Sequence, residues 1–226
     1  VELKGHSGAV RCVDFSRCGH FLLTCSDDKT VKTWSSPSRK FVATLGEHAN
    51  WVRSAKFAPD GRVAASCGDD KLVKLWNVES RQCVRTFFDH DDAVRDVAFS
   101  SDGTCLVSAG DDRAVNLWDV RTYALLQHYE AHDGPVTSLS LDPAGRFLAT
   151  ASVDSTLKLY DLRQGQLLYT LRGHSGAVGC VAFSEGAGQQ QLFASGGADK
   201  LVMLWRARLD AVVAPGAPAA KPPLKK

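Results

Sequence analysis

His, Ser or Thr, and Asp recur together five times along the 226-residue chain, and these are the side chains of a hydrolase catalytic triad. In such a triad the histidine takes the proton of a hydroxyl nucleophile, and the acid orients the histidine. An aromatic residue ends each set here, ten positions after the hydroxyl residue and six after the acid. The five sets are His6, Thr24, Asp28 and Trp34; His48, Ser66, Asp70 and Trp76; His90, Ser108, Asp112 and Trp118; His132, Thr150, Asp154 and Tyr160; and His174, Ser195, Asp199 and Trp205.

The repetition argues against catalysis, because an enzyme needs one such site in one cleft. We predict a structural network instead, in which the Asp caps a tight turn and the His bridges the Asp to the hydroxyl. The hydroxyl then meets the Trp N–H, so that each buried polar group has a partner. In the fourth set the hydroxyl of Tyr160 must stand in for the indole N–H. The sequence therefore predicts no catalytic residue.

The histidines do not indicate a metal site either. His90-Asp91 and His132-Asp133 are the residue pairs of a metal phosphohydrolase, but here they lie in strand connections, and the other copies lack that Asp. One histidine per repeat also keeps the five too far apart to share an ion. We expect neither a bound metal nor a cofactor.

The spacing of the sets defines the architecture. The five histidines fall 42 residues apart, and a fixed period of this length is typical of repeat folds. Within a repeat, four short strand-like runs alternate with turns rich in Gly, Asp and Pro. One such sheet cannot bury both faces alone, so radial stacking into a β-propeller is predicted.

We place the predicted all-β propeller at residues 1–209, in five four-stranded antiparallel blades. The repeats run over about 5–46, 47–88, 89–130, 131–172 and 173–209. The stretch 185–191 lengthens the first hairpin of the fifth repeat. The Pro, Ala and Lys composition of 210–226 predicts a disordered linker.

Charge and cysteine content narrow the class further. The net charge is +2, but without Lys221, Lys225 and Lys226 the repeats hold 24 basic against 25 acidic residues. Nucleic-acid binding needs a clustered basic footprint, so we expect no such partner. No apolar run of about 18 residues and no signal peptide occur, so we expect no membrane partner. Seven cysteines without CxxC spacing predict reduced thiols in a cytosolic or nuclear protein.

These residues resemble the WD-repeat family over residues 1–206. Gly5-His6 and Gly173-His174 match its opening dipeptide, and Trp118-Asp119 matches its closing one. The resemblance implies a platform that holds other proteins.

Four segments also resemble the later repeats of a centriolar family, the proteome of centriole protein 1. They are residues 51–61, 125–129, 167–171 and 192–199. This resemblance implies a seven-bladed propeller with two further N-terminal repeats, and a structural role in centriole and basal-body assembly or stability and in cilium formation. It also implies a cytoplasmic, cytoskeletal location at the centriole, with centriolar or ciliary scaffold proteins, and tubulin, as partners. Alternatively, residues 1–4 complete the fifth blade, because Leu3 aligns with the outermost strands.

The family's usual docking face predicts where partners bind. In the first three repeats the positions on this face that differ between copies form an Arg/Asp ring around one Trp. In the last two repeats the same positions form a more apolar surface. Trp and Arg are enriched at binding hot spots. Our hypothesis is that Trp51, Arg53 and Arg95 anchor a protein partner; the alternative is that each Arg pairs with an Asp to keep the rim soluble. The predicted partner-binding residues are Arg11, Asp27, Trp51, Arg53, Asp69, Arg95 and Asp111.

The predicted function is a non-enzymatic interaction scaffold of the centriole or basal body. The alternative function is a WD-repeat substrate receptor or signalling scaffold that binds short peptide motifs. The location of the full-length protein in the cell separates the two.

Overall fold

The computed structural model describes residues 2–46, 48–184 and 191–207, and every regular element within them is a β-strand. Strands that follow one another in the chain pair antiparallel, which gives five separate sheets. The all-β propeller fold class is thereby confirmed. The first two sheets contain β1 (Val10–Phe15), β2 (Phe21–Ser26), β3 (Val31–Ser35) and β4 (Lys40–Leu45), then β5 (Val52–Phe57), β6 (Val63–Gly68), β7 (Val73–Asn77) and β8 (Gln82–Phe87).

The remaining sheets repeat this order. The third and fourth contain β9 (Val94–Phe99), β10 (Cys105–Gly110), β11 (Ala114–Asp119) and β12 (Leu125–Glu130), then β13 (Val136–Leu141), β14 (Phe147–Ser152), β15 (Thr156–Asp161) and β16 (Gln166–Arg172). The fifth contains β17 (Val178–Phe183), β18 (Gln191–Gly197) and β19 (Val202–Ala207). Among the described residues it thus has three strands where we expected four. The predicted linker 210–226 and the hairpin insertion before Gln191 lie outside the described residues.

The turn between the second and third strand of each sheet has the same backbone geometry. The residue after each repeated aspartate has a φ between 67° and 69°, a left-handed conformation that costs a non-glycine residue about 1 kcal/mol or more. In the second sheet Asp70 offsets this cost, because its Oδ1 accepts a hydrogen bond from the backbone N–H of Leu72 at 3.3 Å. The five residues with this φ are Lys29, Lys71, Arg113, Ser155 and Lys200.

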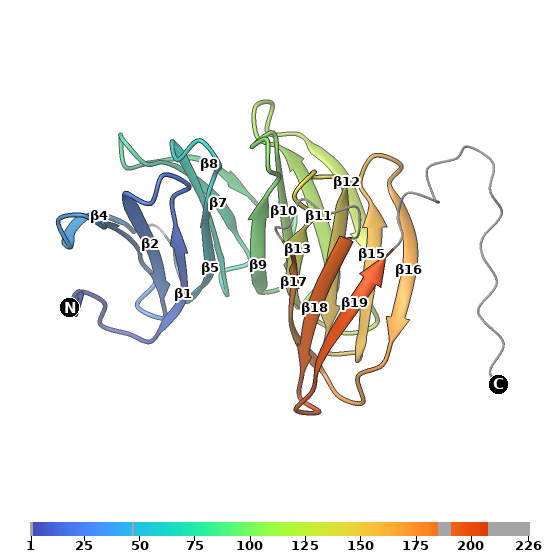
Figure 1. Cartoon of the computed structure of the whole chain (residues 1–226). Helices are drawn as coiled ribbons and strands as arrows, with labels where there is room; N and C mark the ends of the chain where they lie inside the picture. The colour runs from blue at the N-terminus through green and yellow to red at the C-terminus, as the bar shows by residue number, and fades with distance from the viewer. Residues whose placement is uncertain (1, 47, 185–190, 208–226) are drawn as a thin grey trace, which may run out of the picture.

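The hydrophobic core lies between the sheets. Leu23 and Val31 of the first sheet share one buried cluster with Val52 and Trp76 of the second, and each later pair of neighbouring sheets forms a similar cluster. Figure 1 shows the sheets following one another in chain order, with β1, β5, β9, β13 and β17 as neighbouring inner strands. Each sheet is therefore stabilised mainly by the sheets on either side of it.

The two end sheets keep apolar faces exposed. Phe15 of β1 is 60% exposed, although its counterpart Phe57 in the second sheet is buried. At the other end, Val202 and Leu204 of β19 are 77% and 81% exposed, whereas the matching residues of the internal sheets are buried. The described sheets therefore form an open arc, with one unpaired apolar face at each end.

Residues 2–4 do not complete the fifth sheet. They form no strand, and Figure 1 shows the N-terminal segment beside β1 and β2, away from β19. The physical reason is the open arrangement of the sheets, because the first sheet and β19 lie at opposite ends of the series (Figure 1). The alternative that residues 1–4 close the ring is therefore wrong for the described residues.

Candidate functional site

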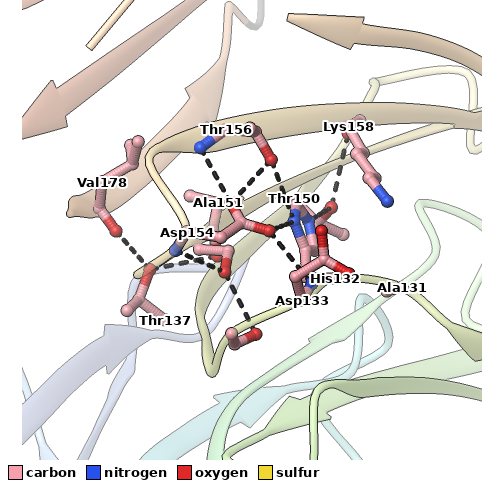
Figure 2. Close-up of polar contacts among 12 residues, drawn as sticks. Ala131, His132, Asp133, Thr137, Thr150, Ala151, Asp154, Thr156, Lys158 and Val178 are labelled. Carbon is pink, nitrogen blue, oxygen red and sulfur yellow. Dashed lines mark hydrogen bonds and ion pairs between the residues drawn. The ribbon is translucent and has the colours of Figure 1, made fainter. Parts of the chain in front are cut away.

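The repeated polar set forms a closed hydrogen-bond network in every sheet. The Nδ1 atom of each His lies 2.6 to 3.0 Å from its Asp carboxylate, and the Nε2 atom lies 2.5 to 2.8 Å from the Ser or Thr hydroxyl. Figure 2 shows the fourth sheet, where His132 lies between Asp154 and Thr150. The arrangement has the connectivity of a catalytic triad, with the hydroxyl on one side of the imidazole and the acid on the other.

The hydroxyls of this network are buried, so a substrate cannot reach them as nucleophilic catalysis requires. Ser66, Ser108 and Thr150 have no exposed surface, and Thr24 and Ser195 are also buried. A substrate carbonyl needs to approach the hydroxyl oxygen within hydrogen-bond distance. Here that space is occupied by the side chains of the neighbouring strands. The network therefore holds the β2–β3 turn of each sheet to the segment that enters its first strand.

The aromatic end of the network varies between sheets. The indole N–H donates to the repeated hydroxyl from Trp34, Trp76 and Trp205, at 2.9, 2.7 and 2.8 Å. The buried Nε1 of Trp118 has no hydrogen-bond partner, and this ring stacks on Phe87, with the ring centroids 4.8 Å apart. Our expectation of a hydroxyl partner is therefore wrong for Trp118.

Tyr160 does not replace the indole as we expected. Its hydroxyl donates to the backbone carbonyl of Ala131 at 3.2 Å, and not to Thr150. The ring of Tyr129, 4.9 Å away, packs beside it. A phenol extends further than an indole N–H and in a different direction, so Tyr160 reaches past the hydroxyl to the backbone before His132.

The ionisation of the repeated aspartates follows from their contacts. Burial alone would raise the pKa of each carboxyl, but the hydrogen bonds from His, from backbone N–H groups and, in two sheets, from Thr outweigh it. The pKa of all five carboxyls is therefore lowered. For His132, burial lowers the pKa, so its neutral form is favoured. The repeated networks therefore stabilise the fold while their aspartates are ionised.

Acid should therefore destabilise the protein. Each repeated Asp has a folded pKa below the ordinary value of 3.8, so its contribution is present above that value and is lost as the pH falls through the folded pKa. We expect the free energy of unfolding to fall as the pH decreases from about 5 toward 3. Urea denaturation followed by tryptophan fluorescence measures this. An Asp60→Asn variant, changed in a surface turn, should keep the wild-type slope, and a pH-independent free energy over this range would contradict the expectation.

The predicted partner-binding residues form a row across the first three sheets. Arg53 donates from Nε and Nη2 to the two carboxylate oxygens of Asp69, both at 2.6 Å. Arg95 pairs with Asp111 in the same way at 2.8 and 2.5 Å, and Arg11 pairs with Asp27. Such two-bonded Arg–carboxylate pairs fix the guanidinium in one orientation.

Trp51 lies between two of these guanidinium groups. The Cζ atoms of Arg11 and Arg53 lie 5.8 and 5.1 Å from the centroid of its ring, within the range of cation–π attraction. The backbone is fixed too, because the Trp51 carbonyl accepts a hydrogen bond from the N–H of Asp69 at 2.9 Å. The indole is nevertheless 42% exposed. We name these seven residues, Arg11, Asp27, Trp51, Arg53, Asp69, Arg95 and Asp111, the Trp51 surface.

The ion pairs within the Trp51 surface favour the charged forms of Arg11, Asp27 and Arg95. The hydrogen bond with Asp27 raises the pKa of Arg11 and lowers the pKa of Asp27, and the hydrogen bond with Asp111 raises the pKa of Arg95. The last two sheets lack these pairs. At the position of the arginines the fourth sheet has Thr137, whose hydroxyl donates to the Val178 carbonyl of the next sheet at 2.6 Å. The Trp51 surface is therefore confined to the first three sheets.

One carboxylate that the sequence pattern did not identify joins three sheets. Asp96 of β9 accepts hydrogen bonds from the Ser54 hydroxyl at 2.9 Å, the Ser138 hydroxyl at 3.2 Å and the Leu139 N–H at 3.0 Å. Burial raises its pKa, although the bonds from Leu139 and Ser54 act in the opposite direction. The signal in the sequence is an acid at a position where the other repeats have Ser or Cys.

The described residues offer no cluster of metal ligands and no helix that could span a membrane. No group of three or more His, Cys, Asp or Glu side chains in this part of the chain could hold a metal ion. None of the described residues belongs to a helix long and apolar enough to cross a bilayer.

Comparison with known proteins places the chain among repeat propellers. Residues 2–157 match the family described as "WDR36/Utp21 second beta-propeller domain", and residues 165–206 match "WD domain, G-beta repeat". Over 36 residues the chain is 53% identical to Transducin beta-like protein 2 of Mus musculus and 50% identical to that of Homo sapiens. Over 40 residues it is 45% identical to an uncharacterized WD repeat-containing protein of Schizosaccharomyces pombe.

These matches to individual relatives are short. They cover 16% of this chain and 8% of each transducin beta-like protein, and 18% of this chain and 5% of the yeast protein. None of these descriptions names a centriolar protein. The similarity therefore concerns the repeat unit and not the activity of a whole relative.

Proposed function

Because the chain belongs to the WD-repeat β-propellers, in the family described as the WDR36/Utp21 second beta-propeller domain, we propose that it is a non-enzymatic scaffold that holds other proteins. The observation that carries this proposal is the Trp51 surface. Its centre is an exposed indole, and fixed guanidinium groups flank it. The buried hydroxyls of the repeated network support the non-enzymatic part of the proposal.

The geometry of the Trp51 surface suits a binding hot spot. Trp and Arg bury large areas on binding, and side chains that are already fixed lose little conformational entropy when a partner arrives. Asp27, Asp69 and Asp111 fix the arginines, so this ordering cost is met within the free protein. A partner would bury the Trp51 ring face and use the row of guanidinium groups at its edge.

The alternative, a rim kept soluble by ion pairs, accounts for part of the arrangement. Each Arg does pair with an Asp of its own sheet, as that alternative requires. Exposed ion pairs contribute little to stability, however, and a soluble rim needs no large aromatic ring at its centre. The exposed Trp51 therefore favours a docking role.

Replacing Trp51 and Arg53 by Ala tests the docking role. We expect the double variant of the tagged full-length protein to lose recovery of its cellular partners by about 30-fold or more, since the loss of even one hot-spot residue costs about 2 kcal/mol or more. Quantitative affinity capture measures the loss. The matched control is Phe88→Ala with Arg85→Ala, an exposed aromatic and an arginine at the outer edge of the second sheet, which should bind as the wild type does.

Thermal unfolding must accompany this comparison. The docking role is contradicted if the Trp51/Arg53 variant stays folded and recovers the same partners in the same amount. If both double variants lose partners equally, the effect does not arise from the Trp51 surface, and the proposal fails as well.

We further propose that the scaffold belongs to centrioles and basal bodies, where it supports their assembly or stability and cilium formation. The support for this is the resemblance of residues 51–61 and 192–199 to a centriolar family. The expected partners are centriolar or ciliary scaffold proteins and tubulin, and the expected location is the cytoskeleton.

Imaging of the tagged full-length protein decides between this location and the alternative function. Centriolar signal that persists after microtubules are depolymerised is the expected result. Diffuse cytoplasmic signal, with ubiquitin-ligase subunits among the captured proteins, would instead identify a substrate receptor that binds short peptide motifs.

A further inference from the structure

Two cysteines lie directly opposite each other at the seam between the first two sheets. Cys12 of β1 and Cys25 of β2 are register partners in an antiparallel pair, so their side chains point to the same face. Directly opposed residues have Cα atoms about 4.5 to 5.5 Å apart, which is within the range of disulfides. Both side chains pack into the cluster between the first and second sheets.

The other repeats provide an internal comparison for this pair. The same register position holds Ser54 and Cys67, Asp96 and Ala109, Ser138 and Ala151, and Cys180 and Gly196 in the second to fifth sheets. Cysteine occupies both sides of the pair in the first sheet alone. The fold therefore does not require two thiols at this position.

The two thiols are in different environments. Cys12 is partly exposed and Cys25 is buried, so a solute reaches Cys12 first. The sulfur of Cys12 also lies 3.6 Å from the Ala55 carbonyl and 3.9 Å from the Ser54 hydroxyl of the next sheet.

The contact between the thiols favours the thiolate of Cys12. A hydrogen bond from the Cys25 thiol lowers the pKa of Cys12 to about 6, against the effect of burial. The same hydrogen bond and burial raise the pKa of Cys25. Thiolate character and access are the two properties that make a cysteine sensitive to oxidation.

We propose that Cys12 and Cys25 are a redox-active pair, which a peroxide converts to a cross-strand disulfide between β1 and β2. The Cys12 thiolate attacks one peroxide oxygen and becomes a sulfenic acid, while the other oxygen leaves as hydroxide, which takes up the proton that Cys12 had released and becomes water. The Cys25 sulfur then attacks the Cys12 sulfur, and the hydroxyl leaves as a second water with the Cys25 proton. Two thiols and one hydrogen peroxide thus give one disulfide and two waters. A dithiol reductant reverses the step.

The position of the pair gives this oxidation a structural consequence. Bond formation draws the Cys12 sulfur toward Cys25 and away from the Ala55 carbonyl and the Ser54 hydroxyl. These two contacts join the inner strands β1 and β5. The disulfide therefore replaces contacts between sheets by a covalent link within the first sheet, and this inference does not depend on the docking role of Trp51.

Peptide mapping tests the pair in the whole folded chain. Trypsin separates a Cys12–Arg17 peptide from a Cys18–Lys29 peptide that contains both Cys18 and Cys25. The experiment therefore uses the Cys18→Ser variant, treated with hydrogen peroxide, alkylated and digested without reductant. We expect the two peptides to be linked, with two thiols per chain lost to alkylation and regained after dithiothreitol.

Two further variants complete the test. Cys180→Ser, a change at another exposed cysteine, should leave the link intact, whereas Cys12→Ser should keep Cys25 fully alkylatable after unfolding. Oxidation of Cys12 to sulfinic acid without a link, a link from Cys12 to Cys67 instead, or an unreacted Cys12 would each overturn the proposal. The mapping of the Cys18→Ser chain decides the question even if Cys12→Ser does not fold.

Discussion

Replacing Asp96 with Ala is expected to lower the free energy of unfolding by about 3 kcal/mol, because three hydrogen bonds between sheets are lost at once. Its carboxylate connects Ser54 of the second sheet with Ser138 and the Leu139 N–H of the fourth. A hydrogen bond contributes about 1 kcal/mol net, so the three together account for about 3 kcal/mol, and the stranded partners also lose their acceptor. Urea denaturation followed by circular dichroism measures the change.

The Asp96→Asn variant separates charge from shape. Its side chain has the same size, but an amide NH₂ would face the Leu139 N–H or the serine hydroxyls, so we expect a smaller loss than for Ala. A variant at an exposed acid, Asp91→Ala, serves as the control and should unfold at nearly the wild-type urea concentration. If Asp96→Ala and Asp91→Ala have equal effects, Asp96 does not connect the sheets energetically.

The difference in unfolding free energy between the wild type and Asp96→Asn should change with pH in a defined direction. Burial raises the folded pKa of Asp96 above the ordinary value of 3.8, so the unfolded chain releases its proton first as the pH rises. The stability contributed by Asp96 is then complete below that value and declines until the pH passes the folded pKa. We expect the advantage of wild type over Asp96→Asn to shrink between pH 4 and neutrality, and a growing advantage would contradict the raised pKa.

The repeat framework could be predicted from the sequence because the same residue types recur at the same spacing in five repeats. Residues that recur in all five, such as His48 and Asp70, occupy equivalent places in every sheet, and one argument about polar satisfaction covers them all. Asp96 has no counterpart of its own type in the other repeats. Three of its partners come from other sheets, so no spacing within one repeat could identify it.

Local aromatic packing could not be predicted either. The sequence places Trp118 and Tyr160 at the same position of the repeat as Trp76, but outer strands supply the rings against which they pack. Phe87 stacks on Trp118, and Tyr129 packs against Tyr160. The recurring position within the repeat therefore identifies the aromatic residue but not the ring that packs against it or the partner of its polar atom.

The repeat pattern also does not predict whether the apolar residues of the two end sheets are buried. Val202 and Leu204 occupy strand positions that are buried in the internal sheets, so their sequence pattern is that of core residues. Whether such residues become core depends on the sheet that packs against them. Exposed apolar faces of this kind promote association.

Replacing Trp76 with Ala is expected to cost about 3 to 5 kcal/mol, the range measured when a buried Trp or Phe is cut to Ala. Trp76 is buried in the cluster between the first two sheets, where it packs with Leu23 and Val31. The loss combines the transfer of the indole, the cavity that remains and the hydrogen bond from its Nε1 to the Ser66 hydroxyl. Thermal and urea unfolding should both show the decrease.

Substitution by Phe isolates the hydrogen bond, and Trp118 provides the matched control. Both indoles are buried and lose the same volume, but Trp76 donates to Ser66 whereas the Nε1 of Trp118 has no partner. Trp76→Phe should therefore be more destabilising than Trp118→Phe by about 1 kcal/mol, the net contribution of one hydrogen bond. Removing the unpaired N–H of Trp118 also relieves a buried polar group, which increases the difference. Equal losses for the two Phe variants would mean that the indole N–H contributes nothing to the repeated network.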